Sequence, residues 1–182
     1  MKNRFKHAEK FLLLIIIVFI GISACKTKSR KLTPKEHEAF KENLVKANRG
    51  LVDLDQDKIK TFAKRRNWEM QVSETGMWYQ ILESESGKKA QAGLVAHLKY
   101  KVSLLDGTMC YTSDSLGNMV FKIGQGGVES GLEEAILMMK IGDKGRFIMP
   151  PHLAHGLLGD ENKIPSRTII VYQTELLNLT KY

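Results

Sequence analysis

Three groups of residues in this sequence could take part in chemistry. His152 and His155 are three positions apart and could ligate a metal, but they follow Pro150-Pro151, which indicates a loop, and no Cys, Asp or Glu nearby completes a ligand set. Cys110 could act as a nucleophile, but no sequence signature pairs it with a base. Residues 124–127 (Gly-Gln-Gly-Gly) are not followed by the Gly-Lys-Ser/Thr that opens a phosphate-binding helix. These groups therefore predict neither a metal nor a cofactor, and no covalent intermediate.

The N-terminus has the pattern of a cleaved secretory signal. Residues 1–10 are basic, residues 11–20 form an unbroken apolar run, and small residues precede Cys25. The apolar stretch is shorter than the roughly 20 residues that a transmembrane helix needs. Residues 22–25 (Ile-Ser-Ala-Cys) resemble a bacterial lipobox, in which the cysteine becomes the lipidated N-terminus once residues 1–24 are removed. We expect lipidated Cys25 to be a stable membrane anchor, the alternative being an uncleaved anchor with an incidental cysteine.

Composition and charge restrict the class of protein. The chain has 182 residues, enough for one ordinary domain plus extensions. Its formal net charge is +8, and the basic excess lies largely in the first third, as in a membrane-proximal leader. Apart from residues 64–66 there is no basic run of the kind that binds nucleic acid, so we expect no nucleic-acid partner. If Cys25 carries lipid, only Cys110 remains, and a disulfide within the domain is excluded.

A tether and two helices are expected between the anchor and the main domain. Residues 25–33 are polar and basic without periodicity, which is typical of a flexible tether close to lipid headgroups. Residues 33–36 (Thr-Pro-Lys-Glu) form a capping box with proline at the first helical position, and they predict a helix that ends before Gly50. A second short helix is predicted at residues 57–66. We interpret residues 34–67 as a helical extension that docks on the domain or on a second copy of itself.

From Trp68 onward the pattern indicates strands around one helix. Strands are predicted at residues 77–82, 93–104, 146–149 and 167–179, with a hairpin turn at Asp106-Gly107. One helix is predicted at residues 130–140, with Ser130 and Glu133 as a capping box and an apolar stripe formed by Leu132, Ile136 and Met139. Residues 68–182 are therefore expected to form an α+β domain, in which a half-wrapped antiparallel sheet folds around one short helix.

This stretch resembles the FKBP domain. The resemblance runs from His97 to Leu177, and its specific part is residues 128–142, which begin Val-Glu-Ser-Gly-Leu-Glu-Glu-Ala and end Ile-Gly. The other matching positions are Tyr100, Leu105-Asp106-Gly107, residues 121–124, Pro151, Ala154, Gly156, Ile164-Pro165, Tyr172 and residues 175–177. Together with the lipobox and the helical extension, the chain resembles FKBP-type lipoproteins of Bacteroidetes, including isomerases associated with gliding motility.

The resemblance implies a peptidyl-prolyl cis/trans isomerase. Rotation about an X-Pro bond crosses a barrier of roughly 18–20 kcal/mol but breaks no bond, so an apolar, water-poor pocket with a few fixed donors is enough. In the family, the backbone N–H at the Glu129 position holds the carbonyl of the ligand. The positions that match the family pocket are Tyr100, Tyr111, Phe121, Val128, Glu129, Leu132, His155, Ile164 and Tyr172 as catalytic residues, with Cys110 and Met119 as binding residues.

Four of these positions depart from the common family pattern. Leu132 replaces the tryptophan floor of many members, Tyr111 a common aspartate, Cys110 a common aromatic residue, and His155 a tyrosine. A roomier, differently polar pocket with modest turnover is expected. Residues 157–163 are too few for the chaperone domain that some bacterial members insert there.

The expected function is isomerisation of X-Pro bonds in exported proteins of a bacterial cell envelope, for example components of gliding or secretion machinery. The expected location is the periplasmic side of a membrane, the outer membrane in the favoured interpretation, with proline-containing client polypeptides as partners. Two alternatives stay open: a lipid-anchored chaperone or peptide-binding module with little isomerase activity, and a structural part of an envelope machine. The sequence leaves the clients and the oligomeric state open.

Overall fold

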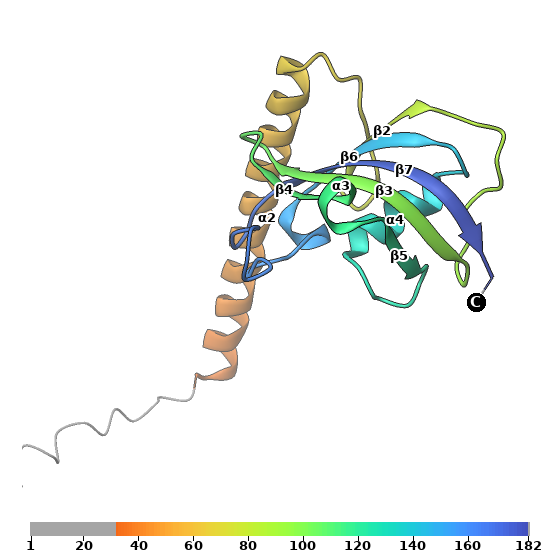
Figure 1. The fold of residues 1–182 in the computed structure, drawn as a ribbon. Helices are drawn as coiled ribbons and strands as arrows, with labels where there is room; N and C mark the ends of the chain where they lie inside the picture. Colours follow the sequence, from red (N-terminus) through yellow and green to blue (C-terminus); the bar gives the residue numbers. More distant parts are fainter. Residues whose placement is uncertain (1–31, 182) are drawn as a thin grey trace, which may run out of the picture. The chain divides into compact units, whose positions relative to one another are not determined.

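The computed structural model describes residues 32–181, so Cys25 and its lipobox lie outside the described residues. The chain divides into two units, residues 1–45 and residues 46–182. Within residues 32–181, no helix combines the length and apolar composition needed to cross a membrane. The elements, shown in Figure 1, are α2 (Pro34–Arg65), β1 (Gln71–Val72), β2 (Trp78–Glu83), β3 (Val95–Leu104), β4 (Met109–Thr112), α3 (Ser113–Leu116), β5 (Met119–Lys122), α4 (Ser130–Met138), β6 (Lys144–Met149), η2 (Pro151–Leu153) and β7 (Ile170–Thr180).

One antiparallel sheet organises the domain, in the order β1-β2-β6-β7-β3-β4. The first part of β3 also pairs with β5, whereas its later part pairs with β4. Asp106-Gly107 forms the predicted hairpin turn between β3 and β4, where Gly107 has φ 95° and donates its N–H to Leu104 O at 3.1 Å. Figure 1 shows α4 against one face of the twisted sheet, so the predicted α+β fold is confirmed.

Both faces of the central strands are apolar, because each face is covered. Phe147 and Tyr172 belong to the main core, which α4 covers with Leu132 and Ile136. Ile148 of β6 and Val171 of β7, together with Ile169 just before β7, form a second cluster with Ile59 and Phe62 of α2. Because both faces of these strands are covered, consecutive residues of the strands are apolar, and not only alternate ones.

The helical extension differs from the prediction. The expected break at Gly50 is wrong, because α2 runs without interruption from Pro34 to Arg65. A glycine inside a helix costs about 1 kcal/mol relative to alanine, which the buried contacts of Ile59 and Phe62 offset. The predicted capping box is confirmed, since Thr33 N–H donates to Glu36 Oε2 at 2.8 Å and Glu36 N–H to Thr33 Oγ1 at 3.3 Å.

The boundaries of α4 also correct the prediction. The helix ends at Met138 rather than at residue 140, and its N-cap is Glu129 rather than Ser130. The predicted capping box between Ser130 and Glu133 does not form, because Glu133 Oε1 instead accepts the N–H of Gly126 at 3.0 Å. The predicted apolar stripe is confirmed by the full burial of Leu132, Ile136 and Met139. The sequence analysis missed β1, β4, α3 and β5, which are all short.

Candidate functional site

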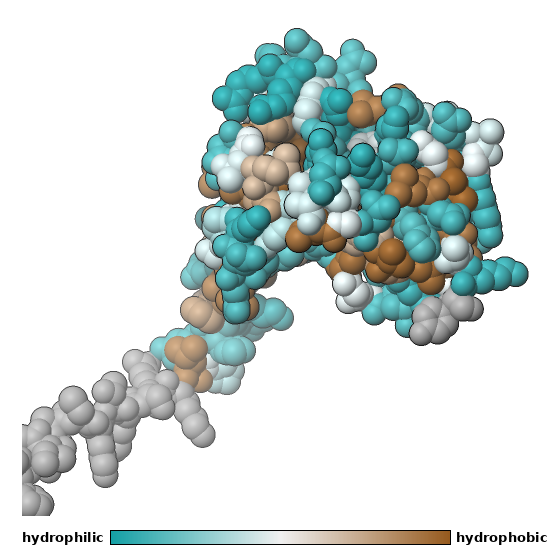
Figure 2. Space-filling view, viewed as in Figure 1, coloured by the Kyte–Doolittle hydropathy of each residue, from teal (hydrophilic) through white to brown (hydrophobic). Residues whose placement is uncertain are grey.

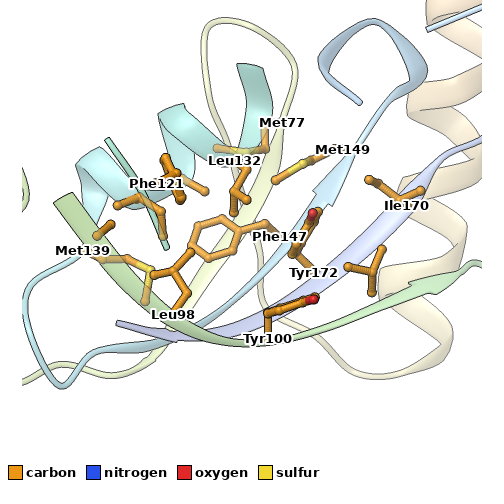
Figure 3. Close-up of a cluster of buried hydrophobic side chains, with 14 of the residues drawn as sticks. Met77, Leu98, Tyr100, Phe121, Leu132, Met139, Phe147, Met149, Ile170 and Tyr172 are labelled. Atoms are coloured by element: carbon orange, nitrogen blue, oxygen red, sulfur yellow. The ribbon is translucent and has the colours of Figure 1, made fainter. Parts of the chain in front are cut away.

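The predicted pocket residues come together where α4 meets the sheet. Six of them are buried in the main core, with at most 8% of each side chain exposed: Tyr100, Cys110, Phe121, Leu132, Ile164 and Tyr172. Figure 3 shows Leu132 on the α4 side of this cluster and Tyr172 and Tyr100 on the sheet side, where they come from the neighbouring strands β7 and β3. These residues form an apolar floor with two phenol hydroxyls at its edge.

A hollow of about 460 Å³ opens beside this floor. Its lining comes from β5, from the bend before α4 and from the segment after η2: Met119, Gly126, Gly127, Val128, Glu129, Ala154 and His155. Four of the predicted residues, Met119, Val128, Glu129 and His155, therefore line the hollow directly. Among the described residues, no hydrogen bond uses the backbone N–H of Glu129, which is available to a ligand carbonyl.

A carboxylate stands at the centre of the site. Tyr172 Oη donates to Glu129 Oε1 at 3.0 Å, and His155 Nε2 lies 2.8 Å from the same oxygen. The His155 contact is an ion pair when the ring is protonated, but Nε2 makes no well-aligned hydrogen bond with the described residues. Burial, with the Glu129 charge second, raises the pKa values of both Tyr172 and Tyr100, so both phenols stay neutral. His155 thus faces Glu129 as well as the hollow, which the sequence analysis did not foresee.

Tyr111 and Cys110 face the loop before β7 rather than the hollow. Tyr111 donates its hydroxyl to Asp160 Oδ2, and this hydrogen bond raises the pKa of the phenol. The Cys110 Sγ lies 3.7 Å from the backbone oxygen of Lys163, and burial raises the pKa of its thiol. Both side chains contact the loop that carries Ile164 to the floor.

Asp160 organises this loop. Its Oδ1 accepts the backbone N–H groups of Asn162 at 2.9 Å and Ile164 at 2.7 Å, in addition to the Tyr111 contact at Oδ2. Burial alone would raise the pKa of Asp160, but these hydrogen bonds outweigh it and lower the pKa to about 2. Sequence reasoning missed Asp160, and also Ala154, Gly126 and Gly127 in the hollow. An Asp two residues before an Asn in a short loop was the available signal for Asp160.

Replacing Asp160 by Asn should lower stability at neutral pH, with a loss that shrinks in acid. Because the folded-state pKa of about 2 lies below the ordinary 3.8, the ionised carboxylate stabilises the fold above about pH 4 and loses this effect as the pH falls towards 2. Urea unfolding followed by tryptophan fluorescence at pH 7 and in steps from 4 to 2 measures the difference. The exposed Asp57→Asn is the matched control. A difference in unfolding free energy between wild type and Asp160→Asn that stays constant down to pH 2 would contradict the stabilising role of the ionised Asp160.

Comparison with known proteins agrees with this geometry. The profile of the family described as FKBP-type peptidyl-prolyl cis-trans isomerase matches residues 86–177, half of the chain. This chain belongs to that family.

Relatives and solved structures show how far the likeness reaches. FK506-binding protein 2 of Yarrowia lipolytica is 33% identical over 105 residues, 57% of this chain and 73% of that protein. FKBP-type peptidyl-prolyl cis-trans isomerase FkpA of Aeromonas hydrophila is 32% identical over 110 residues, 60% of this chain but 40% of that protein. The crystal structure of FkpA from Escherichia coli has a TM-score of 0.62 at 25% identity, covering 100% of this chain and 90% of that chain. AtFKBP13 has a TM-score of 0.59 at 26% identity, covering 60% of this chain and 98% of that chain.

Proposed function

We propose that this protein isomerises X-Pro bonds of exported client proteins while a lipid on Cys25 holds it at the membrane of a bacterial envelope. The observation that carries the enzymatic part is the apolar floor of Leu132, Tyr172 and Ile164 beside a hollow that contains an unused backbone N–H at Glu129. Such a site suits a proline ring with its preceding carbonyl. The lipobox sequence supports the anchor.

The chemistry that this site supplies is conformational. A twisted amide has less charge separation than the planar amide, so a water-poor apolar surface favours it. The Glu129 N–H fixes the carbonyl beside the rotating bond, and the floor holds the proline ring. No bond is made or broken, so no nucleophile is needed.

Refolding of a protein whose slow phase is limited by proline isomerisation tests this proposal. Residues 26–182, which lack the lipid-bearing Cys25, should shorten the slow phase in proportion to their concentration, because the isomerisation of each client molecule becomes catalysed. A slow phase that keeps its rate while the client binds would contradict the proposed catalysis.

Exposed leucines favour a second candidate function, client holding without turnover. Leu157 and Leu158 are 75% and 80% exposed, in the loop that follows the hollow-lining His155. Figure 2 shows further hydrophobic surface between hydrophilic side chains in the area where Figure 1 places β5 and α4. A holding module would raise the yield of refolding without changing the rate of the slow phase.

Replacing Cys110 by Ser should leave kcat/KM within about twofold of wild type, since a buried thiol with a raised pKa supplies no thiolate. EDTA should likewise have no effect on the rate. An X-Pro peptide assay of both conditions measures this. Loss of activity with either one, in a protein that keeps its circular dichroism spectrum, would show that covalent or metal chemistry takes part.

The anchor is tested separately by Cys25→Ser. We expect this variant to remain an unprocessed precursor that takes up no radiolabelled palmitate in bacteria, because cleavage follows lipid attachment to that thiol. Cys110→Ser is the matched control and should be labelled like wild type. Continued labelling of Cys25→Ser would contradict the proposed anchor, whichever membrane or compartment contains the protein. The outer membrane and gliding or secretion components are the proposed location and clients.

A further inference from the structure

The Glu129 carboxylate is placed to contact more than the protein itself. It stands at the N-cap of α4 and lines the hollow, with its side chain 13% exposed. Both of its contacts, to Tyr172 and to His155, are made by Oε1. Among the described residues, Oε2 has no hydrogen-bond or ion-pair partner. One carboxylate oxygen is therefore held in place by the protein, and the other remains available to a bound group.

The surroundings of the hollow are acidic, although the whole chain has a net charge of +8. Of the residues that line the hollow, only Glu129 and His155 are ionisable, and the part-buried His155 carries charge only when protonated. Glu133 binds the backbone of the lining residue Gly126, and Asp160 lies in the adjoining loop with a lowered pKa of about 2. Lys163 is a base in the same loop as Asp160, with its Nζ 5.4 Å from the centre of the Tyr111 ring.

We propose that Glu129 makes the site selective for X-Pro segments that carry a lysine or arginine beside the proline. This inference rests on the proposed isomerase site, because it takes the proline ring to bind on the floor with its carbonyl at the Glu129 N–H. A side chain adjacent to that proline then lies within reach of Oε2. A carboxylate that is already oriented by two contacts binds a cation without losing further side-chain freedom. An acidic side chain at the same place meets a like charge that water screens poorly.

Binding of three peptides that differ only in the residue before proline tests this selectivity. The peptides carry Lys, Leu or Glu before Pro, and their Kd values for the full chain in detergent are measured by isothermal titration calorimetry at low and high salt. At low salt the Lys peptide should bind about tenfold more tightly than the Glu peptide, and high salt should narrow the ratio. In Glu129→Gln the ratio should fall to about twofold at most.

The matched control is Glu134→Gln, which removes one negative charge from the same helix. Glu134 accepts the Thr75 hydroxyl at 2.6 Å and does not line the hollow, so its replacement should keep the tenfold ratio approximately unchanged. Equal binding of the Lys and Glu peptides to the wild type would overturn the inference, as would a Lys preference that survives in Glu129→Gln. Turnover of the same peptides is recorded in parallel. Charge-selective binding without turnover would refute the isomerase activity and leave the charge selectivity supported. Turnover without a charge preference would refute the selectivity and leave the isomerase activity supported.

Discussion

Tyr172→Ala should lower kcat/KM for an X-Pro peptide by at least about tenfold, which corresponds to roughly 1.4 kcal/mol of transition-state stabilisation. The Tyr172 ring is 2% exposed and contributes to the floor, and its hydroxyl holds Glu129 at 3.0 Å. Its removal opens the floor to water and releases the carboxylate, so both the apolar surface and its orientation are lost.

Two comparisons separate this effect from loss of the fold. Truncation of a buried aromatic residue can cost about 3–5 kcal/mol of stability, so circular dichroism must show that Tyr172→Ala remains folded. Tyr79→Ala removes a part-buried tyrosine from β2, outside the hollow, and should keep kcat/KM within about twofold. Tyr172→Phe keeps the ring and should lose less activity than the alanine variant. Full activity in a folded Tyr172→Ala would remove Tyr172 from the site.

The second large effect is expected at the junction between α2 and the loop before β7. Arg167 Nη2 lies 2.7 Å from Asp55 Oδ2 and donates to Leu51 O at 3.1 Å. The Asp55 side chain is only 4% exposed, so Arg167→Met would leave a buried carboxylate with Lys58 at 4.0 Å as its remaining cation. We expect a loss of about 3 kcal/mol in the free energy of unfolding, the low end for a buried pair because Arg167 itself is 29% exposed.

Urea unfolding of single and double variants measures this pair. The double variant Asp55→Asn/Arg167→Met should lose less unfolding free energy than the sum of the two single variants, because it leaves no buried Asp55 carboxylate without its arginine. Lys144→Met breaks an exposed ion pair with Glu83 and should cost less than about 1 kcal/mol. Arg167 has φ 52°, and methionine at this position bears the same backbone strain. The difference in stability between wild type and Arg167→Met therefore measures the loss of the charge. If the loss of unfolding free energy in the double variant equals the sum of the losses in the two single variants, Asp55 and Arg167 are not coupled.

Long and strongly patterned elements were predictable from the sequence. The alternation of Ile170, Tyr172, Thr174 and Leu176 predicted β7, and all four are buried. Gly50 misled the prediction because a glycine lowers local helix propensity, whereas tertiary contacts further along the chain decide whether the helix continues. The four-residue strands β4 and β5 have too few residues to show a period, and their pairing with β3 supplies the specificity.

The floor of the site was predictable, but its polar network was not. Leu132, Tyr100 and Tyr172 were placed by resemblance, and the structure brings them together. The contact of Glu129 with Tyr172 joins residues 43 positions apart, and that of Tyr111 with Asp160 joins residues 49 apart. Such pairs depend on how the loops before α4 and β7 return to the sheet, which no local pattern encodes.

The cis-to-trans isomerisation rate of a short X-Pro peptide, measured with the lipid-free residues 26–182, tests the central claim most directly. The rate should rise in proportion to the concentration of residues 26–182 and should return towards the uncatalysed rate with the same concentration of folded Tyr172→Ala. An uncatalysed rate at every concentration, from a protein whose circular dichroism shows the intact fold, would contradict the assignment of this site as an isomerase.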